Sequence, residues 1–243
     1  MGRAHLLLAA TCICTAGAVP ADAQWVIGGY LGAARTISSA LSVAQPTAGT
    51  DVTFASVDYD GESFTPPVYY GYRIGYFLPQ VPWLGVEAEF IHLKAYARTD
   101  ALTRASGRDR GMPVDRDVPI RDILESFSIS HGLNFALVNV VARRPLGGRA
   151  GAAARVALLG RLGIGPTIPH AESQIGGISR EGYEIGAPGL HLAGGVEVRM
   201  WRELAAMTEY KLTRTDQNVA IHEGQAHGRF TSHHGVFGLA WHF

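Results

Sequence analysis

The last seventeen residues alternate between large apolar side chains and small or polar ones. One face carries Phe237, Leu239, Trp241 and Phe243, and the other carries Ser232, His234, Val236, Gly238, Ala240 and His242. A period of two fits a β-strand and no helix. A last strand with large apolar residues outward and small or polar residues inward is typical of the closing strand of a transmembrane β-barrel.

Six further segments alternate, and the glycine-rich segment 25–33 does so weakly, so the chain is expected to contain eight strands. The predicted ranges are 25–33, 66–77, 84–96, 126–141, 154–167, 188–200, 204–216 and 227–243. The connections are alternately long and short, which is typical of an outer-membrane barrel, whereas a β-sandwich has no reason to sort its loops by parity. The sequence therefore predicts an all-β fold, an eight-stranded antiparallel up-and-down transmembrane β-barrel with an interior filled by side chains.

The third predicted strand changes phase near its middle. Val86 and Phe90 lie on the outward face, and Ile91 then falls out of phase with them. A β-bulge near Phe90 and Ile91 would restore the pattern and leave His92 and Lys94 facing inward. The two longest connections, 35–63 and 98–125, are polar, and the second has no apolar periodicity. Both are expected to be irregular.

The inward positions of the predicted strands carry four acids and four bases. They are Arg73, Glu87, Glu89, Arg161, Glu197, Arg199, Glu209 and Lys211. In a narrow interior shielded from water an isolated charge is costly, whereas paired and hydrogen-bonded charges can fix the shape of a barrel. We therefore expect most of these residues to form a buried ion-pair network.

Residues 1–23 have the pattern of a secretory signal peptide, and residues 24–243 are expected to form the barrel. Arg3 precedes an apolar run from Leu6 to Val19, and Ala-Asp-Ala at 21–23 offers a cleavage site. Both cysteines, Cys12 and Cys14, lie in this segment, so the barrel is expected to have neither disulfides nor thiolate chemistry. A lipoprotein-type cleavage before Cys12 is the less favoured alternative.

Composition narrows the choice of partners. Lys+Arg and Asp+Glu balance at 21 each, so there is no basic excess that would indicate nucleic-acid binding. Thirty glycines, nine tyrosines, nine phenylalanines and four tryptophans fit close strand packing and aromatic girdles at the membrane interfaces. We expect a monomer in the outer membrane of a Gram-negative bacterium, with outer-membrane lipid as its partner and the barrel-assembly machinery needed for insertion.

Histidines are the main candidates for chemistry, because they lie beside or beyond the expected external ends of strands. They are His92, His131, His170, His191, His222, His227, His233 and His234. Metal ligation needs two or three convergent imidazoles or carboxylates, and His170 with Glu172 forms one such pair. The other pairs are His222 with Glu223 and His233 with His234. The alternative is that these histidines are amphipathic residues at the membrane interface.

A serine hydrolase is a further possibility. Ser232 and His234 share a face, and Glu209 or Glu197 would orient the imidazole. Residues two apart on a strand lie roughly 6–7 Å from each other, which is longer than a serine–histidine hydrogen bond. The spacing therefore permits this arrangement without indicating it.

Short motifs occur in order along the chain. They are Tyr59-Asp60-Gly61-x-Ser63-Phe64-Thr65-x-Pro67, Tyr70-Gly71-x-Arg73, Gly85-Val86 followed by Glu89 and His92-x-Lys94, Gly132-Leu133-Asn134 with Asn139, Gly163-x-Gly165 followed by Pro169-His170-x-Glu172, and Glu209-Tyr210-Lys211. In this order they resemble the outer-membrane lipid A oxidases of rhizobia and their relatives. Ser232-His233-His234 and the charged second loop depart from that family.

The resemblance implies an oxygen-dependent oxidation of the proximal glucosamine of lipid A to an aminogluconate unit. Side chains alone rarely activate dioxygen, so the candidate cofactor is a divalent or redox metal, with dioxygen as co-substrate. The expected catalytic residues are His92, His170, Glu172 and His234, of which the three histidines are the expected metal ligands.

The expected substrate-binding residues are Lys94, Asn134, Lys211 and Arg214. The three cationic side chains among them are suited to lipid A phosphates. Interfacial snorkelling is the alternative role for those cations. Two other functions stay open, a non-enzymatic OmpA-like structural or adhesive barrel and a lipid A hydrolase.

Overall fold

The computed structural model describes residues 24–146 and 155–243. The predicted signal peptide and most of the turn after residue 146 lie outside this part of the chain. The described residues are almost all in antiparallel β-strands, with one short 3₁₀ helix, η1, at Ile120–Asp122. Within these residues, none of the helical structure is long and apolar enough to cross a membrane.

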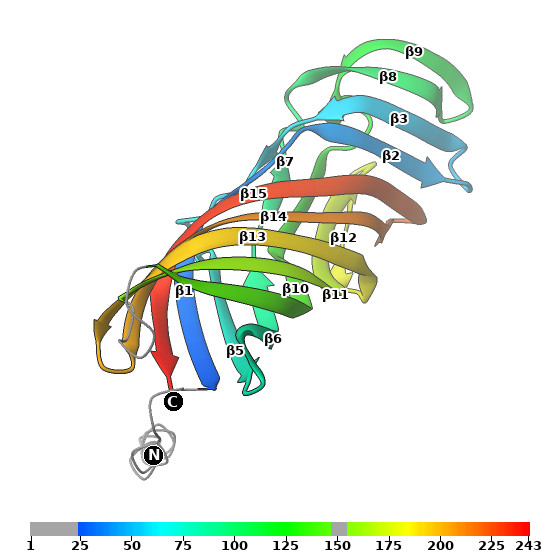
Figure 1. Cartoon of the computed structure of the whole chain (residues 1–243). Helices are drawn as coiled ribbons and strands as arrows, with labels where there is room; N and C mark the ends of the chain where they lie inside the picture. The colour runs from blue at the N-terminus through cyan, green and yellow to red at the C-terminus, as the bar shows by residue number, and fades with distance from the viewer. Residues whose placement is uncertain (1–23, 147–154) are drawn as a thin grey trace, which may run out of the picture.

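Eight strands form a closed ring, in which each strand pairs with the next and the last pairs with the first (Figure 1). They are β1 (Trp25–Thr36), β5 (Tyr70–Leu78), β6 (Val81–His92), β10 (Ser126–Leu146), β11 (Val156–Ile175), β13 (Gly186–Trp201), β14 (Leu204–Ile221) and β15 (Gly224–His242). Each matches one predicted strand. The eight-stranded antiparallel up-and-down barrel is therefore confirmed, including β15 as its closing strand.

An apolar belt surrounds the ring on its outer face. Its exposed side chains come from all eight strands and include Trp25, Ile27, Leu31, Tyr72, Ile74, Val86, Val138, Val140, Leu158, Leu162, Ile164, Leu190, Leu192, Tyr210, Phe237, Leu239 and Trp241. Soluble proteins rarely expose so continuous an apolar surface. A closed ring satisfies its backbone hydrogen bonds internally, so such a wall can lie against hydrocarbon. The belt is the surface expected of a transmembrane barrel.

Charged side chains fill the middle of the barrel interior, as predicted. Three acids and three bases, all buried, converge there: Arg73, Glu87, Glu89, Arg161, Glu209 and Lys211. Their formal charges cancel, and each charge has at least one partner of opposite sign. Tyr30 adds a hydrogen bond of 2.7 Å from its hydroxyl to Glu89 Oε1. This charge network occupies the space that a pore would need.

A smaller ionic group lies nearer the chain terminus. Glu197 accepts a hydrogen bond of 2.9 Å from Arg143 and lies 3.0 Å from Nε2 of His242. Arg199, which was expected to join the network, is half-buried, and its Nε has no hydrogen-bond partner among the described residues. The prediction of a buried ionic network thus holds for seven of the eight residues named.

The long connections are not irregular, which contradicts the expectation from sequence. The first contains β2 (Ser39–Gln45), β3 (Thr50–Val57) and β4 (Tyr59–Asp60), and the second contains β8 (Leu102–Asp109) and β9 (Met112–Pro119). Beyond the ring, the sheet continues from β15 through β2, β3 and β8 to β9 (Figure 1). Short strands β7 (Ala95–Ala97) and β12 (Ile178–Tyr183) lengthen the other side by pairing with β10 and β11.

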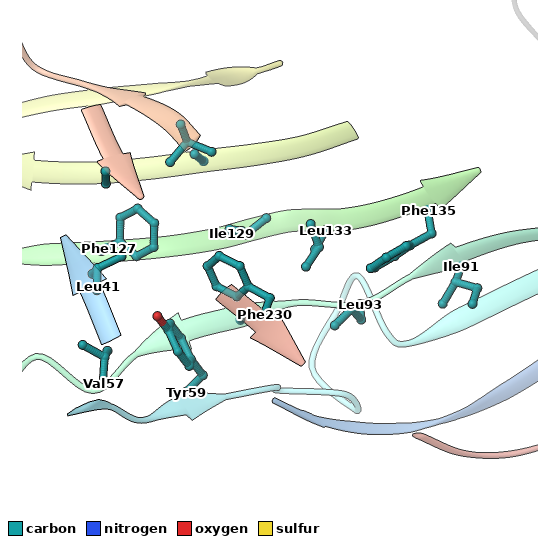
Figure 2. Packing of buried hydrophobic residues seen from close by; sticks show 14 of the residues in the cluster. Leu41, Val57, Tyr59, Ile91, Leu93, Phe127, Ile129, Leu133, Phe135 and Phe230 are labelled. Atoms are coloured by element: carbon teal, nitrogen blue, oxygen red, sulfur yellow. The ribbon is translucent and has the colours of Figure 1, made fainter. Parts of the chain in front are cut away.

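This extension has an apolar core of its own, which explains why the polar loops become strands. Figure 2 shows Leu41, Tyr59, Phe127, Ile129 and Phe230 packed together. They come from β2 and β4 of the first long connection and from the ring strands β10 and β15. The β2–β3 hairpin places alternate residues in this core and most of the residues between them outside. Burial of one face is sufficient to order the strands, since apolar area removed from water stabilises by about 25 cal/mol per Å².

The predicted bulge at Phe90 and Ile91 is absent. β6 stays in register with both β5 and β10 through these residues, and Ile91 is 0% exposed in the apolar core. His92 therefore faces outward, opposite Tyr70. The irregularity lies instead in β10, whose register against β11 shifts between Ile129 and Leu133. The core of the extension takes up Ile91, so the strand has no need to change phase.

Candidate functional site

Polar residues follow the apolar belt at one level on three adjacent strands. The outward row of β6 passes from Phe90 to His92, that of β10 from Ala136 to Asn134, and that of β11 from Ile168 to His170. Asn134 opposes Ile168 directly, and its Oδ1 accepts a hydrogen bond of 2.8 Å from Nδ1 of His92. The belt thus ends in a polar edge over β6, β10 and β11.

The irregular segment of β10 brings a further histidine to this edge. Gly132 has a φ of +114°, a conformation that side chains rarely adopt, and an added Cβ would lie 2.5 Å from Nδ1 of His92. The chain bends here and carries Ser130 and His131 toward β11. Glycine is needed at this bend for both its backbone angle and its lack of a side chain.

Two histidines and a glutamate meet at this bend, and we refer to His131, His170 and Glu172 as the histidine–glutamate cluster. Glu172 Oε1 lies 3.1 Å from Nδ1 of His131 and 3.5 Å from Nδ1 of His170. One potential ligand atom from each residue lies within 4.8 Å of the others. Ser130 donates a hydrogen bond to the same carboxylate oxygen. The sequence predicted His170 and Glu172 as a pair, whereas it named His131 only among the candidate histidines and assigned it to no pair.

Two tyrosines lie on the strands that border the cluster. The ring of Tyr183 on β12 lies 4.4 Å from that of His170. Tyr96 on β7 lies opposite Ser128, and its pKa is raised above the usual value by burial and then by the carboxylates of Glu62 and Glu172. Tyr183 thus packs against a member of the cluster, and Tyr96 lies close enough to Glu172 to be influenced by its carboxylate.

Lys94 follows His92 in the chain but is not available to an external anion. Its side chain is buried, and its ammonium donates a 2.9 Å hydrogen bond to the carbonyl of Thr65. Glu62 lies 3.7 Å from it, and the ring of Tyr96 lies 5.5 Å away. Lys94 thus anchors the segment before β5, which differs from its expected role as a ligand for lipid phosphate.

His234 and Lys211 lie inside the barrel, apart from the outer edge. His234 does face inward as predicted, and it bonds the Tyr69 hydroxyl through Nδ1 and Thr213 through Nε2, both at 2.9 Å. Lys211 is 0% exposed and contacts Glu89 and Glu209. The wall of the barrel separates both residues from His170, so the predicted metal set of His92, His170 and His234 is wrong. Lys211 likewise cannot contact a lipid outside the barrel.

The remaining predicted residues are placed separately. Arg214 is exposed on the outer face of β14, which β13 separates from β11 in the ring. Ser232 Oγ forms a 2.8 Å hydrogen bond with Thr36 Oγ1. Since both ring nitrogens of His234 are engaged by other partners, Ser232 and His234 do not form a serine–histidine pair.

Comparisons with known proteins identify no family for this chain. No family model and no curated protein matches it. Among solved structures, the outer membrane protease OmpT from Escherichia coli matches at 10% identity with a TM-score of 0.49, covering 91% of this chain and 97% of that one. Neisserial surface protein A matches at 10% identity with a TM-score of 0.39, covering 90% and 97%.

A third match is the attachment invasion locus protein Ail of Yersinia pestis. It is 13% identical, with a TM-score of 0.33 and coverage of 89% of this chain and 99% of that one. These identities and scores are low, so the function has to be argued from the residues of this chain.

Proposed function

We propose that this protein is an outer-membrane barrel that modifies lipid A, with oxygen-dependent oxidation of the proximal glucosamine as the favoured reaction. The observation that carries the proposal is the polar edge, where the partly exposed His131 and Glu172 lie directly beyond the apolar belt, backed by the buried side chains of His92, Asn134 and His170. A lipid whose chains lie along the belt presents its headgroup at that level. The resemblance to lipid A oxidases supports the choice of substrate.

The polar edge belongs to the external side of the membrane in this proposal. The backbone N–H of Trp25 donates to the carbonyl of Phe243, so the start of β1 and the chain terminus lie together at one end. At this end the turns from β5 to β6 and from β13 to β14 are short. The long connections and the sheet extension lie at the opposite end, which is the external side of an outer-membrane barrel.

The reaction makes clear demands on the site. Oxidation of the C1 hemiacetal removes the C1 hydrogen and the hydroxyl proton, with two electrons, and passes them to dioxygen, which becomes hydrogen peroxide. Water then adds to the resulting lactone and opens the ring to the carboxylic acid, so the sugar gains one oxygen atom. A base has to take the hydroxyl proton, and we place this step at the histidine–glutamate cluster, because its carboxylate is partly exposed beside two imidazoles.

A structural or adhesive role is the second candidate. The extension through β2, β3, β8 and β9 presents a long sheet beyond the membrane level, with β9 at its edge. Exposed sheet edges are templates for pairing with another chain. This role does not require the residues of the polar edge.

Mass spectrometry of lipid A distinguishes these functions. Lipid A is compared from cells with and without the gene, grown with and without oxygen, and from cells that express Glu172→Gln. The control is Glu203→Gln, which changes an exposed glutamate in the turn between β13 and β14, at the opposite end of the barrel. A gain of one oxygen atom that requires both oxygen and Glu172 supports the oxidase.

Two other outcomes contradict the oxidase proposal. Loss of an acyl chain identifies a hydrolase. Unchanged lipid A in aerobic cells that contain the folded barrel leaves the structural or adhesive role.

A further inference from the structure

We propose that the histidine–glutamate cluster of His131, His170 and Glu172 binds one divalent first-row transition-metal ion. This inference deepens the proposed function, because such an ion would supply the dioxygen-activating centre that side chains lack. Metal binding itself is independent of lipid A, so the two proposals can fail separately.

The distances in the cluster are close to those of a coordinated ion. Metal–ligand bonds of about 2.0–2.2 Å place neighbouring ligand atoms roughly 3.0–3.4 Å apart, for octahedral and tetrahedral geometry respectively. Glu172 Oε1 lies 3.1 Å and 3.5 Å from the Nδ1 atoms of His131 and His170. Two edges of the ligand triangle thus already have nearly the required length, and one ligand atom from each of the three residues lies within 4.8 Å of the others.

The donor set favours a transition metal. Two imidazoles and one carboxylate suit zinc, iron, cobalt or nickel, whereas calcium and magnesium prefer sites made of oxygen ligands. Two histidines and one carboxylate on one face of an ion leave its other positions open, as in non-haem iron oxygenases. Those positions are available to dioxygen and to a headgroup, because His131 and Glu172 remain partly exposed.

The fold holds the ligands in place. His170 and Glu172 lie on one face of β11, which pairs with β10 on one side and β12 on the other. His131 is fixed by the bend that Gly132 allows. Ser130 binds the Glu172 carboxylate and would orient it as an outer-shell partner.

One buried atom points to a missing ligand. Nδ1 of His170 has no hydrogen-bond partner among the described residues, although the residue is only 9% exposed. A buried ring nitrogen normally has a partner. A metal ion shared with Glu172 would satisfy it, and it would also explain why two histidines crowd one carboxylate.

The test uses the full barrel in detergent, purified without a polyhistidine tag and stripped with a chelator. Co²⁺ is added as a spectroscopic probe, and bound Zn²⁺ is counted by elemental analysis. The expected result is one ion per chain. Substitution of a ligand in His131→Gln or Glu172→Gln should weaken binding at least about 100-fold, since loss of an outer-shell partner alone costs roughly 10–100-fold.

Two histidine variants serve as controls. His227→Gln changes an exposed histidine of β15, and His234→Gln changes the buried histidine of the interior. Both should keep one ion per chain with unchanged affinity. Folding of every variant is checked by heat-dependent electrophoretic mobility, so loss of binding is not confused with loss of the barrel.

The proposal is overturned if folded wild-type protein binds no Co²⁺ or Zn²⁺ at one equivalent. Equal binding by the wild type and both ligand variants overturns it as well, because the ion then lies elsewhere. If one ion binds as expected while lipid A is unmodified, the metal site stands and the oxidase proposal fails. If lipid A is oxidised by protein that binds no metal, the oxidase proposal stands and the metal site fails.

Discussion

Glu209 is the residue on which the charge network depends most. Its carboxylate accepts two hydrogen bonds of 2.9 Å from the guanidinium of Arg73, one to each oxygen. Arg161 donates to the same carboxylate, and the ammonium of Lys211 lies 3.3 Å away. Glu209→Gln keeps the size of the side chain but leaves three buried bases against two buried acids.

The expected loss of unfolding free energy follows from these contacts. Hydrogen bonds to charged groups contribute about 1.5–3 kcal/mol each, so the two from Arg73 alone represent ~3–6 kcal/mol. Removal of one partner from a buried ion pair costs about 3–5 kcal/mol. Because both estimates overlap, we expect Glu209→Gln to lose ~3–5 kcal/mol, a large part of the stability of an ordinary domain.

Urea unfolding of the barrel in detergent or bilayers measures this loss. Trp25 and Trp241 lie in the exposed apolar belt, so their fluorescence reports transfer from lipid to water. Glu181→Gln is the control, and it should change stability by less than about 0.5 kcal/mol because its side chain is exposed.

A double variant tests the reasoning further. Arg73→Gln combined with Glu209→Gln restores charge balance, so it should lose ~0.5–3 kcal/mol less than the sum of the single losses. A loss below about 1 kcal/mol for Glu209→Gln, or full additivity in the double variant, would show that the network does not hold the barrel together.

Two further substitutions test the packing of the interior and the outer belt. At Gly71 an added Cβ would lie 2.2 Å from the ring of Tyr30, so Gly71→Ala should cost about 1–3 kcal/mol in urea unfolding; Gly29→Ala, with no atom within 4 Å of the added carbon, should change little. Equal effects of the two alanines would refute the packing argument. Leu162→Arg places a charge near the middle of the belt, where the side chain is 66% exposed, and should cost ~2–4 kcal/mol in bilayers. Leu102→Arg, on the extension outside the belt, should be nearly neutral, and the membrane interpretation fails if Leu162→Arg is neutral too.

The sequence by itself determined the ring of strands. Residues on a strand alternate between two faces, and in this barrel the two faces meet lipid and a charged interior. Because these environments differ so strongly, the alternation is visible in most ring strands, although it is weak in the glycine-rich segment 25–33. The ion-pair network was predictable for the same reason, since a charge at an inward position has to find a partner.

The extension beyond the ring was less visible in the sequence. Leu41 and Val43 on β2, and Val52 and Phe54 on β3, do alternate, but each strand contributes only a few such positions between polar residues. The core that orders them is assembled from hairpins and ring strands far apart in the chain. Its existence depends on contacts that no single segment encodes.

The candidate site was only partly determined by the sequence. The sequence placed His170 and Glu172 together in a loop after the predicted strand 154–167, whereas in the structure β11 continues through both residues and puts them on one face. The role of His131 depends on the shift in register between β10 and β11, for which Gly132 was the one local signal. The absence of a bulge in β6 turned His92 outward, because Ile91 is taken up by the core of the extension.

Tertiary structure also decided which polar residues lie together. His234 and His170 both sit toward the same end of the barrel, yet one faces inward and the other outward. Strand periodicity gives the face of a residue only relative to its neighbours on the same strand, so a single bulge or bend exchanges inside and outside. The cross-strand register determines the face on which each residue lies. It brings His131 close to His170, while the wall of the barrel separates His234 from both.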